Sequence, residues 1–235
     1  MNEAQEITRI LFQDFQTSSI YLFYAIGYSA IAVFLYGCYV QVRKYRRGKP
    51  DASWGEFLSR FWDMVKTMMT HRTIKRRDTA AGKAHAGIFF GFVLLFIGTA
   101  TITLEYDILE PLFGITFWYG DFYLWFSLIL DIAGLAAIAG LVYMMYRRKW
   151  LKLPKLDYTR PDREPGDPDY DRSAYRREDW AFLWVFITIL ITGFLLEASR
   201  LIWLMDDPTV WEYRWWSPVG ASIAHLFHGL GMGPE

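Results

Sequence analysis

Cysteine is nearly absent from this sequence, because only Cys38 among its 235 residues carries a thiol. A single cysteine excludes an intramolecular disulfide, and it excludes a cysteine-ligated zinc or iron–sulfur centre built by this chain alone. A net charge is absent as well, since 25 basic and 25 acidic side chains cancel. The sequence also has no phosphate-binding glycine loop and no interleaved basic and aromatic residues, so we expect no nucleic-acid partner.

Long hydrophobic runs, in contrast, are abundant, and hydrophobic residues make up 53% of the chain. Four runs, at about 19–42, 84–104, 117–146 and 180–204, reach the ~20 apolar residues that an α-helix needs to cross a bilayer. The sequence therefore predicts an all-α integral membrane helical bundle with four transmembrane helices. Residues 1–18 begin with acidic rather than basic side chains, unlike a cleaved signal peptide, and we expect an external N-terminal segment.

Lysine and arginine are distributed very unevenly between the runs. Twelve lie between Arg43 and Lys83, ten lie between Arg147 and Arg177, and only three lie elsewhere. Positively charged residues concentrate on the cytoplasmic side of membrane proteins. The bias therefore predicts an N-terminus outside and cytoplasmic loops at 43–83 and 147–179.

The two predicted cytoplasmic loops differ in pattern. In the first, Ser53 and Glu56 have the spacing of a capping box, and apolar residues follow at helical intervals. This predicts an amphipathic helix on the inner membrane surface, in contact with lipid. The second loop contains four prolines and alternating charges, so we expect little regular structure, in either a solvated linker or a docking surface for a cytoplasmic subunit. Beyond residue 204 we expect an external segment with a brief interfacial helix.

The second run, KAHAGIFFGFVLLFIGT at 83–99, combines one histidine with three glycines. Helical periodicity separates them onto two sides of the helix. The first side comprises His85, Ile88, Phe92 and Phe96, and the second comprises Gly87, Gly91 and Gly98. The spacing of Gly87 and Gly91 is typical of a close approach between two membrane helices, so we assign the glycines to helix packing.

A histidine inside a membrane helix needs a polar partner, water or a metal. One interpretation of His85 is that it hydrogen-bonds a backbone carbonyl or reaches the interface. The other is axial ligation of haem iron, with Phe92, Ile88 and Phe96 along the porphyrin. His225 and His228 follow the fourth run and belong to the opposite side of the membrane. His71 lies in a basic stretch, where we expect a solvated interfacial residue.

Three further polar residues lie inside the predicted spans. Asp131 falls near the middle of the third, as either a structural carboxyl or a proton-transfer group. Glu197 and Arg200 lie near the outer end of the fourth, as either an intrahelical ion pair or a site for a quinone head group and its protons. Glu105 and Asp107 could extend that polar site. Five tryptophans fit an outer aromatic belt, namely Trp118, Trp203, Trp211, Trp215 and Trp216.

The segment HRTIKRRDTAAGKAHAGIFFGFVLLFIGTATITLEYD, with the later GFLLEASRLI and WWSPVG, resembles a known family. It is similar to the membrane cytochrome b domain of heterodisulfide-reductase-related iron–sulfur oxidoreductases of the electron-transfer-flavoprotein:menaquinone oxidoreductase type, and to the gamma subunit of respiratory nitrate reductase. The resemblance covers roughly residues 20–220, and we assign residues 19–235 to such a domain. It implies that His85 ligates b-type haem and that a second ligand lies outside this chain.

The function that the resemblance implies is membrane electron transfer between a quinone pool, with menaquinone as substrate, and cytoplasmic partners. The partners would be an iron–sulfur subunit or domain, with the clusters in a partner chain or a further C-terminal module, and an electron-transfer flavoprotein. The location would be a prokaryotic plasma membrane. Glu197, Arg200 and Asp131 would handle quinone or protons. Two alternatives remain open, namely a redox-inactive membrane anchor for a soluble enzyme and a small ion-coupled transporter.

Overall fold

The computed structural model describes residues 11–12, 15–48, 54–151, 153, 156–159, 163–167, 170–203 and 213–232. The chain divides into two compact units, one formed by Arg9–Thr70 and the other containing His71–Glu235.

Where it is described, the first unit forms the helices α1 (Thr17–Tyr45) and α2 (Trp54–Thr70). Helix α1 is mostly apolar and carries Arg43 and Lys44 in its last turn. Helix α2 carries an aromatic surface on which the rings of Phe57 and Phe61 stack with their centres 6.4 Å apart. The structure thus confirms a helix after the predicted capping box, while Ser53 itself lies outside the described residues.

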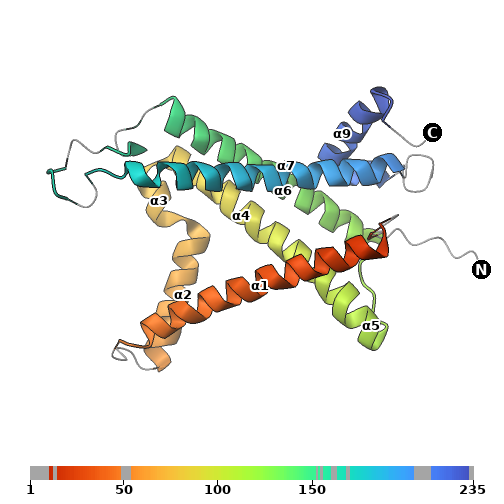
Figure 1. The fold of residues 1–235 in the computed structure, drawn as a ribbon, viewed down its shortest axis with the longest axis horizontal. Coiled ribbons are helices and arrows are strands. Elements are labelled where there is room, and N and C mark those ends of the chain that lie inside the picture. Colours follow the sequence, from red (N-terminus) through yellow and green to blue (C-terminus); the bar gives the residue numbers. More distant parts are fainter. Residues whose placement is uncertain are drawn as a thin grey trace, which may run out of the picture. The chain divides into compact units, whose positions relative to one another are not determined.

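The second unit contains the remaining spans and the short segments that join them (Figure 1). Its elements are α3 (Arg72–Arg77), α4 (Thr79–Thr103), the π-helix η1 (Leu104–Leu109), α5 (Glu110–Phe113), α6 (Gly120–Lys149), η3 (Ser173–Tyr175), α7 (Arg176–Trp203), η4 (Tyr213–Trp216) and α9 (Pro218–Gly229).

Among the described residues, four helical stretches are long and apolar enough to cross a membrane. They are Thr17–Tyr45, Thr79–Phe113, Gly120–Lys149 and Ser173–Trp203. Each overlaps one of the four predicted runs, so the all-α bundle with four candidate spans is confirmed. The second stretch is longer than predicted because the helix continues through η1 and α5.

Helices α4 and α6 pack against each other along a seam of small residues. A Cβ added at Gly91 would lie 2.5 Å from the carbonyl oxygen of Ala133, and one added at Gly140 would lie 2.6 Å from that of Ala84. Contacts this short mean that the two backbones touch where side chains are missing. The prediction that the glycines serve helix packing is confirmed, and α6 contributes a glycine of its own.

Helix α7 completes the core of this unit. The buried residues are Ala137 and Leu141 of α6 with Ile187 and Leu190 of α7, and Ile88 of α4 packs against them. Ile88 also lies against Gly140. This side chain therefore belongs to the α4–α6 contact, and our expectation that it shares a cofactor-facing side with His85 is wrong.

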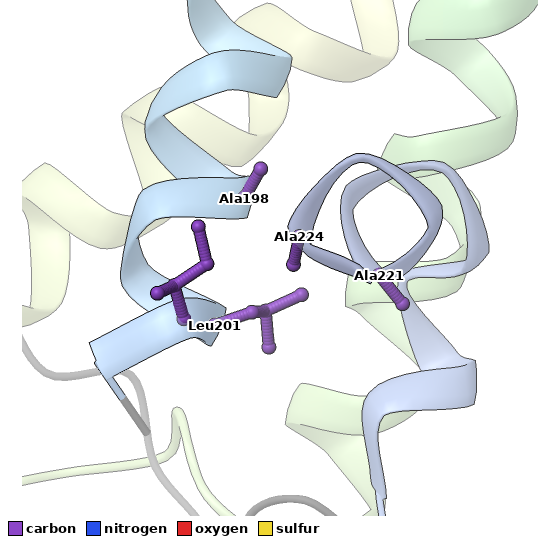
Figure 2. Packing of buried hydrophobic residues seen from close by; sticks show 5 residues of the cluster. Ala198, Leu201, Ala221 and Ala224 are labelled. Carbon is purple, nitrogen blue, oxygen red and sulfur yellow. The ribbon is translucent and has the colours of Figure 1, made fainter. Parts of the chain in front are cut away.

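Helix α9 packs on the last turns of α7 through small and branched side chains. Figure 2 shows Ala198 and Leu201 of α7 beside Ala221 and Ala224 of α9, and all four are buried. Alanine at both sides of the contact lets the helices approach closely. The expected short C-terminal helix is present, and it is part of the bundle's core.

One end of the bundle is held by an ion pair between α6 and the start of α4. Asp78 accepts the N–H of Ala81 at 3.0 Å as the N-cap of α4, and it also pairs with Arg147. The hydrogen bond from Arg147 lowers the pKa of Asp78 below its ordinary value of 3.8. The cap and the ion pair together fix this helix start beside the end of α6.

The connection before α6 is held by Glu105, which is 2% exposed. Its Oε2 accepts the N–H groups of Phe117 at 3.0 Å and Trp118 at 2.8 Å. Glu105 therefore holds this connection in place. Trp118 is 1% exposed and packs 4.8 Å from the ring of Phe126, so our assignment of this tryptophan to an outer aromatic belt is wrong.

The second predicted loop is anchored to the helices on each side of it. The hydroxyl of Tyr158 donates to Asp179 at 3.1 Å, and Arg148 at the end of α6 forms an ion pair with the same carboxylate at 3.1 Å. Burial, together with the bond to Asp179, raises the pKa of Tyr158. Where it is described, the loop has little regular structure, as predicted, apart from the short η3 and isolated bridges such as Thr159 with Asp171.

Candidate functional site

The Glu197–Arg200 pair forms the centre of a partly buried polar cluster. These residues are three positions apart on α7, and the Nη2 of Arg200 donates to the Oε1 of Glu197 at 2.6 Å. The guanidinium also lies 5.9 Å from the ring centre of Tyr123 on α6, within cation–π range. The side chain of Arg200 is only 15% exposed and that of Glu197 only 18%, so protein shelters this ion pair.

Asp131 is brought to the same place by α9. Its Oδ2 accepts the N–H of Val219 at 2.7 Å, in the first turn of α9, and its side chain is buried. The approach of α9 requires a glycine, because a Cβ at Gly220 would lie 2.8 Å from the Cγ of Glu197. The three polar residues that the sequence indicated therefore converge on one helix start.

Two serines that the sequence did not indicate join the cluster. The hydroxyls of Ser127 on α6 and Ser217 before α9 lie 2.6 Å apart, and the hydroxyl of Ser217 donates to the Oε1 of Glu197 at 3.2 Å. Ser217 followed by Pro218 has the pattern of a helix start, which the sequence does show. Nothing in the sequence indicates that Ser127, 90 positions earlier, would meet it.

His85 lies at the other end of the unit, beside a second histidine. The ring centres of His71 and His85 are 5.1 Å apart with the planes tilted by 58°. His71 is only 5% exposed and packs against Phe89 and Phe90. Our expectation that His71 is a solvated interfacial residue is wrong, because these aromatic rings remove it from water.

The surroundings of His85 bear on whether this residue can ligate haem. The Nδ1 atoms of His85 and His71 are both buried, and neither has a hydrogen-bond partner among the described residues. Two imidazoles on opposite sides of one metal ion have ring centres roughly 6 Å apart, since each metal–nitrogen bond is about 2 Å. The observed 5.1 Å leaves no room for a porphyrin between the rings. His71 and His85 are therefore not placed as two ligands on opposite sides of one haem, and His85 alone remains the candidate ligand.

The two phenylalanines predicted beside His85 both lie at the protein surface. Phe92 is 51% exposed and its ring centre is 5.6 Å from that of Phe186 on α7, while Phe96 is 65% exposed. Helix α7 therefore provides a neighbour for Phe92. Within the described part of the chain, no group of three or more histidine, cysteine or acidic side chains could hold a metal ion.

The histidine pair and the polar cluster are separated along the bundle. Gly140 of α6 lies against Ala84, the neighbour of His85, and Asp131 is nine residues earlier on the same helix. At 1.5 Å per residue the separation along α6 is about 14 Å, less than half of a ~30 Å hydrocarbon core. His225 and His228 lie on α9, on the side of the polar cluster.

The fold defines an all-α chain with the helices of a multi-pass membrane protein and a sheltered cluster of charged side chains between them. The chain is similar to the EtfAB:quinone oxidoreductase of Syntrophomonas wolfei subsp. wolfei (strain DSM 2245B / Goettingen), with 24% identity over 217 residues that cover 90% of this chain. That stretch is 27% of the relative, so the chain spans about a quarter of its length. No family model and no solved structure matches the chain.

Proposed function

We propose that this chain is the membrane part of a quinone-linked oxidoreductase in a prokaryotic plasma membrane. It passes electrons between a quinone, menaquinone in particular, and cytoplasmic iron–sulfur or flavoprotein partners, with an electron-transfer flavoprotein among them. The observation that carries the proposal is the convergence of Glu197, Arg200 and Asp131 at the start of α9. The printed name of the relative, a quinone oxidoreductase, supports it.

The cluster has the groups that quinone chemistry needs. Reduction of a quinone adds two electrons and two protons, and negative charge develops on its carbonyl oxygens. The Arg200 guanidinium keeps its charge and stabilises such an oxygen. Glu197, sheltered at 18% side-chain exposure, exchanges a proton with the head group as general acid or base. Asp131 holds the start of α9 against the pair.

His85 would hold b-type haem through an imidazole nitrogen, with Phe92 and Phe96 on its side of α4. Haem would supply a one-electron carrier between the quinone and the cytoplasmic partners. Because Cys38 is the single cysteine, the iron–sulfur clusters would be ligated outside the residues of this chain.

Replacement of Glu197 by Gln tests the quinone site. Glutamine keeps the shape and a hydrogen-bonding oxygen but cannot carry the proton, so turnover with a soluble quinone such as menadione should fall by about a hundredfold. The matched control is Glu178→Gln, an exposed glutamate at the start of the same helix. Visible absorption and thermal unfolding of both variants check that the complex remains assembled.

The opposite result would separate the remaining alternatives. Unchanged quinone turnover in the Glu197→Gln complex contradicts the assignment of this cluster. A complex with neither haem absorption nor quinone turnover would indicate a redox-inactive anchor, and proton or sodium uptake that depends on Asp131 and Glu197 would indicate a transporter.

A further inference from the structure

Ser127, Ser217 and Glu197 form a continuous chain of hydrogen bonds across three helices. The Oγ atoms of the two serines lie 2.6 Å apart, and Ser217 continues the chain to Glu197 at 3.2 Å. Ser217 is 6% exposed, while Ser127 is only partly buried. The chain therefore connects the carboxylate of Glu197 on α7 with a partly buried hydroxyl on α6.

The position of Ser217 makes this hydrogen bond unexpected. Ser217 is the N-cap residue of α9, and such a serine normally accepts a backbone N–H from the first turn. Here it makes no side-chain cap bond, and Asp131 from α6 accepts the N–H of Val219 instead. Because Asp131 takes over the capping, the hydroxyl of Ser217 is available to Glu197.

The number of hydrogen atoms fixes the direction of the chain. A serine hydroxyl has one hydrogen to donate and can also accept. The hydrogen of Ser217 is directed at Glu197, so in its contact with Ser127 it accepts, and Ser127 donates. Both hydroxyls thus point toward Glu197, which is the arrangement for delivery of a proton to that carboxylate.

We propose that Ser127 and Ser217 relay protons to Glu197. The inference rests on the proposed quinone site and adds its proton path. The two electrons come from the iron–sulfur or flavin partner, and Glu197 gives its proton to a quinone carbonyl oxygen, so that a quinone O–H bond forms as the carboxyl O–H bond breaks. Glu197 then takes the hydrogen of Ser217, Ser217 takes that of Ser127, and Ser127 takes one from water. Rotation of the hydroxyls restores the chain for the second proton, and quinol oxidation runs the same steps backward.

The relay is tested with the complete complex in membranes, with reduced electron-transfer flavoprotein as donor and menadione as quinone. Ser217→Ala and Ser127→Ala should each lower kcat by about tenfold, leave KM for menadione unchanged and raise the solvent deuterium isotope effect. Ser127→Thr retains a hydroxyl and should retain most of kcat. The matched control is Ser222→Ala, because Ser222 is an exposed serine of α9 whose hydroxyl only donates to its own helix at Pro218.

The outcomes distinguish this relay from the site on which it rests. If both serine-to-alanine variants keep the kcat and the isotope effect of the wild type while Glu197→Gln loses turnover, the relay is wrong and the quinone site stands. If Glu197→Gln also keeps its turnover, the quinone site itself is wrong. Should Ser217→Ala fail to assemble, the comparison of Ser127→Ala with Ser127→Thr decides, and equal kcat values in that pair overturn the relay.

Discussion

Asp131 shows how one carboxylate in an apolar helix can be stabilised by the end of another helix. The N-terminus of α9 carries a partial positive charge and free N–H groups, and the carboxylate of Asp131 accepts one of them at 2.7 Å. Of the two interpretations that the sequence left open for Asp131, this geometry supports a structural role. The residue holds α9 in place, so the proposed quinone site leaves proton exchange to Glu197.

His85 and His71 are neighbours with different expected roles. If His85 is an axial ligand, His85→Ala should remove the b-type Soret and alpha absorption from the assembled complex. His71→Ala should retain that absorption, because the ring separation of 5.1 Å does not allow both histidines to bind one haem from opposite faces. Absorption spectra of the two purified variants measure this. Equal haem content in wild type and His85→Ala would contradict the ligand assignment, and loss in both variants would contradict the distinction between the histidines.

The contact between helices α4 and α6 depends on glycines, which have no side chain to keep the two backbones apart. In Gly91→Ala the new Cβ would lie 2.5 Å from the Ala133 carbonyl oxygen and 2.8 Å from the Cβ of Ala137, so the helices must separate. We expect a loss of about 1–3 kcal/mol in the free energy of unfolding, typical of overpacking. The control is Gly193→Ala on α7, where an added Cβ meets nothing within 4 Å. Thermal unfolding in detergent compares the two.

The control should be neutral or slightly more stable, because alanine favours the helix by about 1 kcal/mol over glycine. If Gly91→Ala and Gly193→Ala unfold at the same temperature, the seam of small residues does not hold the bundle together.

Local patterns predicted the elements, and long-range contacts account for what the sequence could not show. The spans follow from run length and apolar content, and the glycine seam follows from residue spacing, which are both local properties. The bond between Asp131 and Val219, in contrast, joins residues 88 positions apart. Burial of His71 was missed because its basic neighbours indicate solvent, whereas the rings of Phe89 and Phe90, more than a dozen residues later, cover it.

The histidine pair at His85 and the polar cluster at Glu197 lie toward opposite ends of the second unit. His85 is near the start of α4, where the ion pair of Asp78 with Arg147 holds the helix ends. Glu197 is near the end of α7, where α9 begins. Basic residues of this unit lie at 72–83 and 147–177, so the positive-inside rule predicts that the His85 end faces the cytoplasm. A redox centre at His85 would then face cytoplasmic donors, with the quinone site deeper in the membrane.

Cysteine labelling tests this orientation, because only Cys38 has to be removed beforehand. After Cys38→Ser, one new cysteine at a time is introduced by Gln16→Cys before α1, Arg47→Cys after it, or Glu164→Cys between α6 and α7, all at exposed positions. A thiol reagent that cannot cross membranes should label the first variant in intact cells. It should label the other two only after the membrane is opened, because they belong to the strongly basic loops. Labelling of Glu164→Cys in intact cells would reverse the orientation and place the His85 end outside, where no cytoplasmic iron–sulfur or flavoprotein partner could reach it.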